Sequence, residues 1–314
     1  MLPQGLSLSR RFFESALPSI RESIPDILAC SAAGLVGEGS DCLGLDDSIS
    51  RDHDWGPAFC LWIPDETLSL HARRIEQAMG TLPETFEGFR TRMKPDQRMG
   101  RTGPLPLRGF YRRFLGMSKL PEHWKEWRSI PEYHLCSCTN GEVFLDNTGE
   151  FTSFREALLA YYPADVRRKK IAARCMIMAQ AGQYNLPRCL SRGDSIAAML
   201  AAARFSEAAL SMVFLLNKRY MPFYKWAGRM VQHLPILGGK TAALLRSLAE
   251  NPWSSHEQAM SAVDSIETFC ALVAMELRDQ HLTNIEGSWL WALGPSIQKE
   301  IKDQELRSLN VMED

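Results

Sequence analysis

The sequence predicts an α+β fold, in which a small mixed sheet within residues 1–155 is followed by an all-α helical bundle over residues 156–314. Two observations lead to this prediction. The first half alternates short β-prone runs with helical patterns, whereas after about residue 154 apolar residues recur only at helical spacing. A length of 314 residues suits two domains that each have their own hydrophobic core.

In the first half, strand patterns outnumber helical ones. Residues 27–36 are small and apolar, residues 55–63 are rich in aromatic residues, and residues 86–93 form a third candidate strand. Residues 133–145 resemble a hairpin that turns at Asn140-Gly141. Residues 66–79 carry a helical pattern.

In the second half, every periodic segment is helical. The candidate helices cover residues 166–181, 196–216, 242–248 and 261–277, and prolines separate several of them. The segment 195–216 is apolar nearly all round, so we expect it to be the central helix of the bundle.

The composition indicates a folded soluble protein, with 45% hydrophobic residues, 23% charged residues and a formal net charge of -1. Such a chain has no overall attraction for nucleic acid or for an acidic membrane. The N-terminal segment lacks the apolar core of a signal peptide, and no run of about 18 apolar residues occurs. We therefore expect a cytoplasmic protein that does not contact a membrane.

The eight cysteines are expected to be reduced packing residues. Their spacing is scattered and no export signal precedes them, which argues against disulfides. Cys136 and Cys138 form a CxC pair, but no second Cys or His pair follows at zinc-finger spacing. The cysteines are Cys30, Cys42, Cys60, Cys136, Cys138, Cys175, Cys189 and Cys270.

A glycine-rich turn follows the first candidate strand and reads Gly37-Glu38-Gly39-Ser40. Glycines at such a place let backbone N–H groups approach a ligand closely, and the N-terminus of a following helix favours phosphate. The Ser40 hydroxyl adds a donor. The turn therefore predicts phosphate binding at Gly39 and Ser40, with an ordinary tight turn as the alternative.

Two carboxylates, Asp52 and Asp54, follow this turn after a gap of eleven residues, Asp41 to Arg51. On a strand, side chains two residues apart point to the same face. Paired carboxylates suit a hard divalent cation, and Mg²⁺ favours such a site when phosphate completes its shell, with Mn²⁺ as the alternative ion. Two such ions about 3.5–4 Å apart can clamp an in-line phosphoryl displacement.

The pattern Gly39-Ser40, eleven residues, Asp52-x-Asp54 resembles the signature of the DNA polymerase β-like nucleotidyltransferase superfamily. The strings GEGSDCLG, SRDHDWGPAFCLW, GQYNLPRCLSRGD and FLLNKRYMPFYKW resemble a bacterial family within that superfamily, still labelled a domain of unknown function (family 4037). The resemblance implies a nucleotidyltransferase domain over residues 1–155. His53 departs from the pattern, since the superfamily usually has an apolar residue there; it is either a hydrogen-bonded core histidine or an acceptor contact.

The resemblance also implies a third carboxylate on a later strand. Asp146 fits, because it ends the apolar run Val143-Phe144-Leu145 and could complete a metal site or act as general base. Glu142 is the competing acid, although its place beside the Asn140-Gly141 turn favours solvation.

Further cations are candidates for phosphate or acceptor contacts. The segment between Gly88 and Leu120 contains nine basic residues and one acidic residue. This excess of positive charge indicates a solvated surface, a flap over a triphosphate or a groove for an anionic acceptor such as RNA. In the second half, Lys218 and Lys225 are candidate nucleotide contacts or plain helix-end lysines. Arg188 and Asp194 are candidate acceptor or phosphate contacts, with a helix N-cap as the simpler role for Asp194.

These patterns together predict a nucleotidyltransferase that binds a nucleoside triphosphate and Mg²⁺, transfers the nucleoside monophosphate to a hydroxyl acceptor and releases pyrophosphate. A small molecule such as an aminoglycoside-like polyol is the favoured acceptor, with RNA or protein as alternatives. A non-catalytic nucleotide sensor or partner-binding protein on the same fold is the competing hypothesis.

Overall fold

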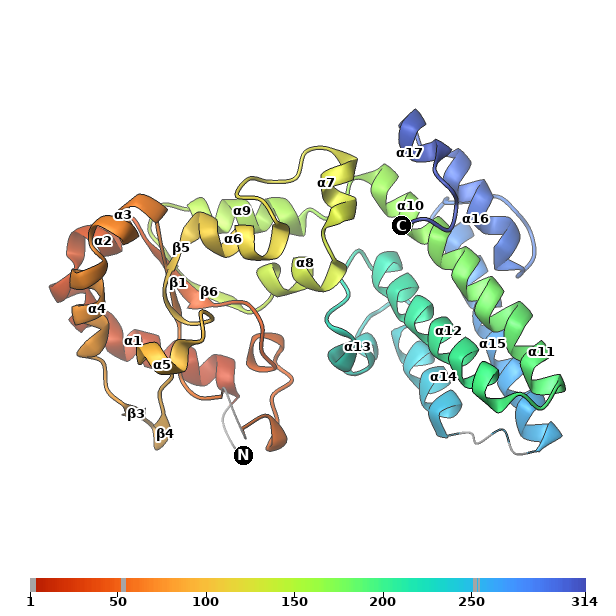
Figure 1. Cartoon of the computed structure of the whole chain (residues 1–314), viewed down its shortest axis with the longest axis horizontal. Coiled ribbons are helices and arrows are strands. Elements are labelled where there is room, and N and C mark those ends of the chain that lie inside the picture. Colours follow the sequence, from red (N-terminus) through yellow and green to blue (C-terminus); the bar gives the residue numbers. More distant parts are fainter. Residues whose placement is uncertain (1–3, 52–54, 251–252, 254) are drawn as a thin grey trace. The chain divides into compact units, whose positions relative to one another are not determined.

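The computed structural model describes residues 4–51, 55–250, 253 and 255–314. The chain divides into two compact units (Figure 1). Unit 1 comprises Met1–Pro121 and Ile130–Ala160, and unit 2 comprises Glu122–Ser129 and Tyr161–Asp314. Within the described residues, strands occur in unit 1 alone, so the chain is a mixed α+β protein with a small sheet.

A four-stranded mixed sheet forms the centre of unit 1, with strand order β5-β2-β1-β6. β1 runs antiparallel to both β2 and β6, and β2 pairs in parallel with β5. A separate two-stranded hairpin is formed by β3 and β4. The strands are β1 (Ala32–Leu35), β2 (Cys60–Ile63), β3 (Thr85–Phe86), β4 (Phe89–Arg90), β5 (Gly103–Pro106) and β6 (Glu142–Asp146).

Helices cover both faces of this sheet (Figure 1). On one face, residues of α1, α2 and α4 pack against alternate strand residues such as Leu61. On the other face, Trp62 stacks on Phe151 of α9 with ring centroids 3.8 Å apart and meets Phe110 of α6 edge to face. Successive residues of β2 therefore face two separate apolar layers. The helices of unit 1 are α1 (Gly5–Ser23), α2 (Pro25–Ala29), α3 (Asp65–Leu70), α4 (Ala72–Gly80), α5 (Pro95–Arg98), α6 (Leu107–Leu115), α8 (Glu132–Thr139) and α9 (Glu150–Leu159).

Within its described residues, unit 2 contains helices joined by loops and no strand. Each predicted helix is present, and α12 has the predicted bounds 195–216. Between α10 and α11 the chain forms a π-helical segment, Ala179–Asn185, which the sequence analysis did not predict. The helices are α7 (Trp124–Ser129), α10 (Ala164–Met178), α11 (Leu186–Ser191), α12 (Ser195–Leu216), α13 (Tyr224–Val231), α14 (Gly238–Glu250), α15 (His256–Asp279), α16 (Leu290–Lys299) and α17 (Gln304–Ser308).

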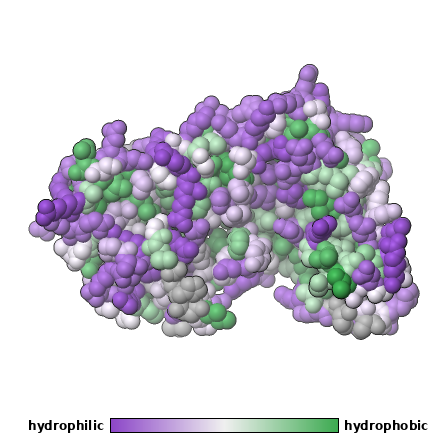
Figure 2. All heavy atoms as spheres, in the orientation of Figure 1, coloured by the Kyte–Doolittle hydropathy of each residue, from purple (hydrophilic) through white to green (hydrophobic). Residues whose placement is uncertain are grey.

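Helix α12 is the central helix only along its second half. From Ala208 to Leu216 it is almost wholly buried, whereas Ile196, Met199 and Leu200 are each more than half exposed. Figure 2 shows hydrophobic surface on the side of unit 2 where α12 and α14 lie. By length and hydropathy α12 could cross a membrane, contrary to our expectation of no such segment, but 61% of the relevant window is buried, as in the core helix of a soluble protein.

Several predicted elements of unit 1 differ from the structure. Residues 27–36 are not one strand, because Pro25 begins the short helix α2, and only Ala32–Leu35 are extended. The helix over residues 66–79 is interrupted at His71, which separates α3 from α4. The strand over residues 86–93 is a hairpin that turns at Glu87 and Gly88, both with positive φ.

The predicted hairpin over residues 133–145 is wrong. Its first half is helix α8, which begins after Pro131 and buries Leu135 and Cys138. Gly141 then approaches β1 so closely that a Cβ would lie 2.0 Å from the carbonyl oxygen of Leu35. Asn140-Gly141 is therefore a helix-to-strand connection held against β1. The close approach to β1, and not a hairpin turn, explains the glycine at position 141.

All eight cysteines are free, and six of them are buried. Burial raises the pKa of Cys60 and of Cys136 to about 12, so these thiols stay protonated at neutral pH.

Candidate functional site

The glycine turn lies where β1 ends and has a backbone that requires glycine at two places. Gly37 and Gly39 have φ values of +136° and +147°. At Gly39 a Cβ would lie 2.3 Å from Asp41 Oδ1. Residues other than glycine rarely adopt this backbone, so both glycines are explained by the shape of the turn. We call residues 37–40 the glycine loop.

Asn140 fixes the glycine loop to the start of β6. Its Oδ1 accepts the backbone N–H of Gly37 at 3.0 Å, and its Nδ2 donates to the Gly37 carbonyl at 2.8 Å. Arg155 donates to the carbonyl of Asn140 at 3.0 Å and to that of Gly141 at 3.2 Å. Two hydrogen bonds from one side chain to the backbone N–H and C=O of a single residue set both the position and the orientation of the loop.

The next backbone N–H groups of the loop are available to a ligand. Within the described residues, those of Glu38, Gly39 and Ser40 donate no hydrogen bond, and neither does the Ser40 hydroxyl. Glu38 and Gly39 are exposed and Ser40 is half-buried. Ser40 precedes a single 3₁₀ turn, Asp41–Leu43, rather than the helix that the sequence analysis expected, and its side chain does not cap that turn. Successive backbone N–H groups without an internal acceptor can donate to an anion.

Ion pairs surround the loop. Asp41 pairs with Arg92 at 2.9 Å, and both side chains are largely buried. Glu38 pairs with Arg113 at 2.5 Å and with Arg101 at 3.4 Å. Among the described residues, at least six of the nine cations between Gly88 and Leu120 pair with acids of unit 1, which makes much of this basic run a structural network. The six are Arg92, Lys94, Arg98, Arg101, Arg108 and Arg113.

The chain on either side of the Asp52–Asp54 motif is held against the N-terminus of α1. Asp46 Oδ2 accepts the backbone N–H of Gly5 at 2.8 Å and Trp55 Nε1–H at 3.0 Å. The Arg51 guanidinium lies 4.1 Å from the centre of the Trp55 ring. A cavity of about 260 Å³ opens beside Trp55, and it is lined by Trp55, Arg90, Thr91, Arg92, Asp96, Gln97 and Met99.

Asp52, His53 and Asp54 themselves lie outside the described residues. Their assignment as metal ligands, with His53 between them, stays a prediction. Among the residues that the structure describes, no three Asp, Glu, His or Cys side chains form a group that could hold a metal ion.

The antiparallel pairing of β6 with β1 separates the two acids of β6. Glu142 pairs with Leu35, next to the glycine loop, whereas Asp146 pairs with Ala32 at the other end of the strand. The four residue steps between the two acids correspond to roughly 13 Å. The structure therefore does not bring Asp146 together with Gly39 and Ser40.

The surroundings of each acid differ accordingly. Both carboxylate oxygens of Asp146 accept backbone N–H groups, from Gly149 at 2.9 Å and Thr152 at 2.8 Å, which stabilises the start of α9. Glu142 forms an ion pair with Arg10 of α1. Gly5, which donates to Asp46, and Arg10, which pairs with Glu142, are about one and a half turns apart on α1. Asp46 and Glu142 therefore both contact the beginning of this helix.

The site residues predicted in the second half all belong to unit 2. Asp194 is the N-cap of α12, since its Oδ1 accepts the backbone N–H of Ala197 at 3.0 Å. Lys218 is exposed just beyond the end of α12. Lys225 lies over the Trp226 ring and Arg188 over the Tyr184 ring, both at 4.8 Å. Nucleotide or acceptor contacts of these residues stay predictions.

The comparison with protein families gives one match, which covers residues 127–227, 101 of the 314 residues, and is described as a domain of unknown function (DUF4037). Over these residues the chain is similar to that family. The matched segment of the chain begins in α7, contains Asn140 and β6, and ends in α13. The glycine loop precedes it. No curated protein and no solved structure matches the chain.

Sequence reasoning missed three contacts that shape the site. Asn140 was interpreted as a turn residue, although an Asn amide can also accept the backbone N–H and donate to the carbonyl of one residue. Asp41 and Asp46 were not singled out, because their partners Arg92 and Gly5 are 51 and 41 residues away. Only their presence beside the glycine loop, in the string GSDCLGLDD, offered a signal.

Proposed function

We propose that unit 1 is the catalytic unit of a Mg²⁺-dependent nucleotidyltransferase. In this proposal the glycine loop binds the phosphates of a nucleoside triphosphate. An acceptor hydroxyl attacks the α-phosphorus, the bond from the α-phosphorus to the bridging oxygen breaks, and pyrophosphate leaves with that oxygen. The acceptor proton passes to a carboxylate.

One observation carries the proposal: consecutive N–H groups of Glu38, Gly39 and Ser40 make no bond within the described residues, on a loop held by Asn140. Backbone donors that are already in place suit a phosphate, because they stabilise negative charge without having to reorganise on binding. The resemblance of the loop and of the Asp-x-Asp motif to the nucleotidyltransferase signature points in the same direction.

Asp52 and Asp54 are the proposed metal ligands. Their sequence neighbours Arg51 and Trp55 stack on each other, and Trp55 is tied to the N-terminus of α1. Of the two acids on β6, Glu142 lies at the same end of the sheet as the glycine loop. The proposal therefore assigns the third carboxylate to Glu142 and leaves Asp146 as a residue that stabilises α9. When bound, Mg²⁺ would neutralise phosphate charge.

The proposed acceptor is a small molecule with hydroxyl groups, such as an aminoglycoside-like polyol. The ion pairing of most cations between Gly88 and Leu120 supports this choice over RNA, since paired cations attract a polyanion less than free ones. An acceptor on RNA or protein is the alternative within the same chemistry.

The competing function is a nucleotide sensor that binds a triphosphate without transferring it. The position of Asp146 favours it, because one of the three carboxylates that the resemblance implies lies at the far end of β6. A sensor would bind triphosphate and release no pyrophosphate, so the two functions differ in a measurable product.

Two substitutions at Ser40 test the phosphate site. Ser40 has φ −66°, which proline also adopts, so Ser40→Pro removes the N–H donor with little backbone strain, whereas Ser40→Ala removes only the hydroxyl. We expect the affinity for a triphosphate in Mg²⁺ to fall about threefold in Ser40→Ala and more than tenfold in Ser40→Pro. Unchanged binding in Ser40→Pro would show that the loop does not hold the phosphates.

A further inference from the structure

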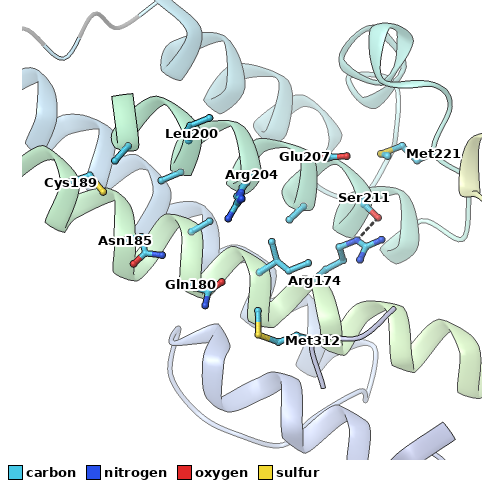
Figure 3. Close-up of a pocket in the computed structure, with 15 residues that line it drawn as sticks. Arg174, Gln180, Asn185, Cys189, Leu200, Arg204, Glu207, Ser211, Met221 and Met312 are labelled. Carbon is cyan, nitrogen blue, oxygen red and sulfur yellow. Dashed lines mark hydrogen bonds between the residues drawn. The ribbon is translucent and has the colours of Figure 1, made fainter. Parts of the chain in front are cut away.

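Unit 2 contains a cavity of about 670 Å³ between α12 and the continuous run of α10, the π-helical segment and α11 (Figure 3). Met221, which follows α12, and Met312, near the C-terminal end of the chain, complete its wall. All lining residues belong to this one unit. The volume matches that of pockets for small organic molecules.

The sequence of α12 explains the space. Ala197, Ala201, Arg204, Ala208 and Ser211 follow one another at alternating spacings of four and three residues, which places them on one stripe of the helix. Three of the five are alanine, so this stripe fills little of the gap to α10. The lining is mostly apolar, with Ile177, Ala181 and Leu200 among its members.

The opposite wall carries a second feature typical of ligand sites. The π-helical segment Ala179–Asn185 supplies Gln180 and Asn185 to the lining. Neither amide side chain bonds another described residue. Single π-helical turns inside helices are frequent at functional sites, because they displace side chains from the regular helical positions.

The two arginines of the lining differ in their partners. Arg174 is engaged: its Nε donates to Ser211 Oγ at 2.8 Å, and it pairs with Asp314 at 2.7 Å. Arg204 makes no ion pair or hydrogen bond to any other residue in the described part of the chain. Figure 3 shows its side chain pointing from α12 into the space between the helices.

The only acid of the lining, Glu207, lies at the edge of the stripe. At 100° per residue, Arg204 is about 20° from the centre of the stripe and Glu207 about 80°. The cation therefore faces the cavity more directly than the carboxylate does. Charge and lining together suit a ligand with one anionic group and an apolar body.

We propose that this cavity binds a small anionic amphiphile, a carboxylate, sulfonate or phosphate ester on a hydrocarbon or aromatic body. The apolar body lies between the alanine stripe of α12 and the wall formed by Ile177 and Ala181. The anionic group accepts hydrogen bonds from the Arg204 guanidinium. This site is separate from the proposed phosphate site of unit 1 and does not depend on it.

The test uses 8-anilinonaphthalene-1-sulfonate, a fluorescent aromatic sulfonate, with the full chain. We expect one saturable site per chain. The dissociation constant should rise about three- to tenfold in Arg204→Gln, and it should fall two- to threefold in Glu207→Gln, since the second change removes a nearby like charge. Decanoate should displace the probe in competition.

Two further variants locate the site. Ala201→Phe fills the cavity and should abolish saturable binding, with circular dichroism as the check on folding. Lys240→Gln is the matched control, because Lys240 lines a separate groove between α14 and α15, and it should leave binding unchanged. Equal losses in Arg204→Gln and Lys240→Gln, several equivalent sites per chain, or unchanged binding in Ala201→Phe would overturn the proposal.

Discussion

The side chain of Asn140 forms two hydrogen bonds with the backbone of Gly37, accepting its N–H at 3.0 Å and donating to its carbonyl at 2.8 Å. The two residues are 103 positions apart, and the bond pair joins the end of β1 to the beginning of β6. The glycine loop is thus positioned by a residue of the second half of unit 1. This relationship makes loop geometry and triphosphate affinity depend on Asn140.

Asn140→Ala should weaken triphosphate binding at least fivefold and lower the free energy of unfolding by about 1–3 kcal/mol, because both bonds to Gly37 are lost. Calorimetric titration and urea unfolding measure the two effects. Asn147→Ala is the control, since Asn147 donates to the Leu28 carbonyl beyond the far end of β6. Asn147→Ala should lower the free energy of unfolding by about 1 kcal/mol and leave triphosphate binding unchanged. Equal affinities in the two variants would contradict the assigned role of Asn140.

Gly39→Ala should destabilise the chain by about 2–3 kcal/mol and abolish triphosphate binding. The added Cβ meets Asp41 Oδ1 and the backbone is strained at φ +147°. At Gly44, with φ +65°, an added Cβ has open space, so Gly44→Ala should cost about 1 kcal/mol and preserve binding. Thermal unfolding and a fluorescent triphosphate analogue report both quantities. A fully stable Gly39→Ala would contradict the close approach of Gly39 to the Asp41 carboxylate.

Glu142→Gln and Asp146→Asn should separate the roles of the two acids of β6. We expect Glu142→Gln to reduce turnover more than tenfold, because it removes a carboxylate beside the glycine loop. Asp146→Asn should instead lower the free energy of unfolding by about 1–2 kcal/mol, since the backbone N–H groups of Gly149, before α9, and of Thr152, in its first turn, lose a charged acceptor. The reverse result, with turnover lost only in Asp146→Asn, would restore Asp146 as the third carboxylate.

Unit 2 should gain stability relative to Lys169→Met as the pH rises from about 8 to about 10.5. Burial lowers the pKa of Lys169 to about 8 from 10.5, so within this window the unfolded chain holds a proton that the folded chain has released. The gain should be on the order of 1 kcal/mol, because hydrogen bonds from Nζ to Gln298 and Asn310 favour the charged form and offset part of the effect of burial. Urea unfolding of both proteins across this range measures it. A difference that is constant with pH would show that Lys169 titrates normally.

The sequence predicted the parts of the fold that depend on local pattern. The helix Ser195–Leu216 follows from its apolar periodicity and from Asp194 as its N-cap. The helix α8 was interpreted as a strand, because Cys136 and Cys138 are spaced as on one strand face and Asn140-Gly141 suits a hairpin turn. Only the packing of this segment decides between helix and strand.

In the candidate site, too, local features were predictable from the sequence and long-range contacts were not. The need for glycine at Gly37 and Gly39 is visible in the sequence, because few other residues tolerate their backbone. The partition of Glu142 and Asp146 between the two ends of β6 depends on strand direction, which a four-residue spacing cannot reveal. The hydrogen bonds of Asn140 to Gly37 could not be predicted, because the two residues are 103 positions apart in the sequence.

The most direct test of the central claim is pyrophosphate release by the wild-type chain and by Asp54→Asn. Each is given a triphosphate, Mg²⁺ and a panel of polyols, aminoglycosides, tRNA and protein extract. We predict release with at least one acceptor, and a rate about 100-fold lower in Asp54→Asn, because phosphoryl transfer depends on positioning and charge neutralisation. The variant should fold normally, since removing one of two neighbouring carboxylates relieves repulsion. Equal release by both proteins would place the active site elsewhere, and triphosphate binding without release from the wild type would identify a sensor.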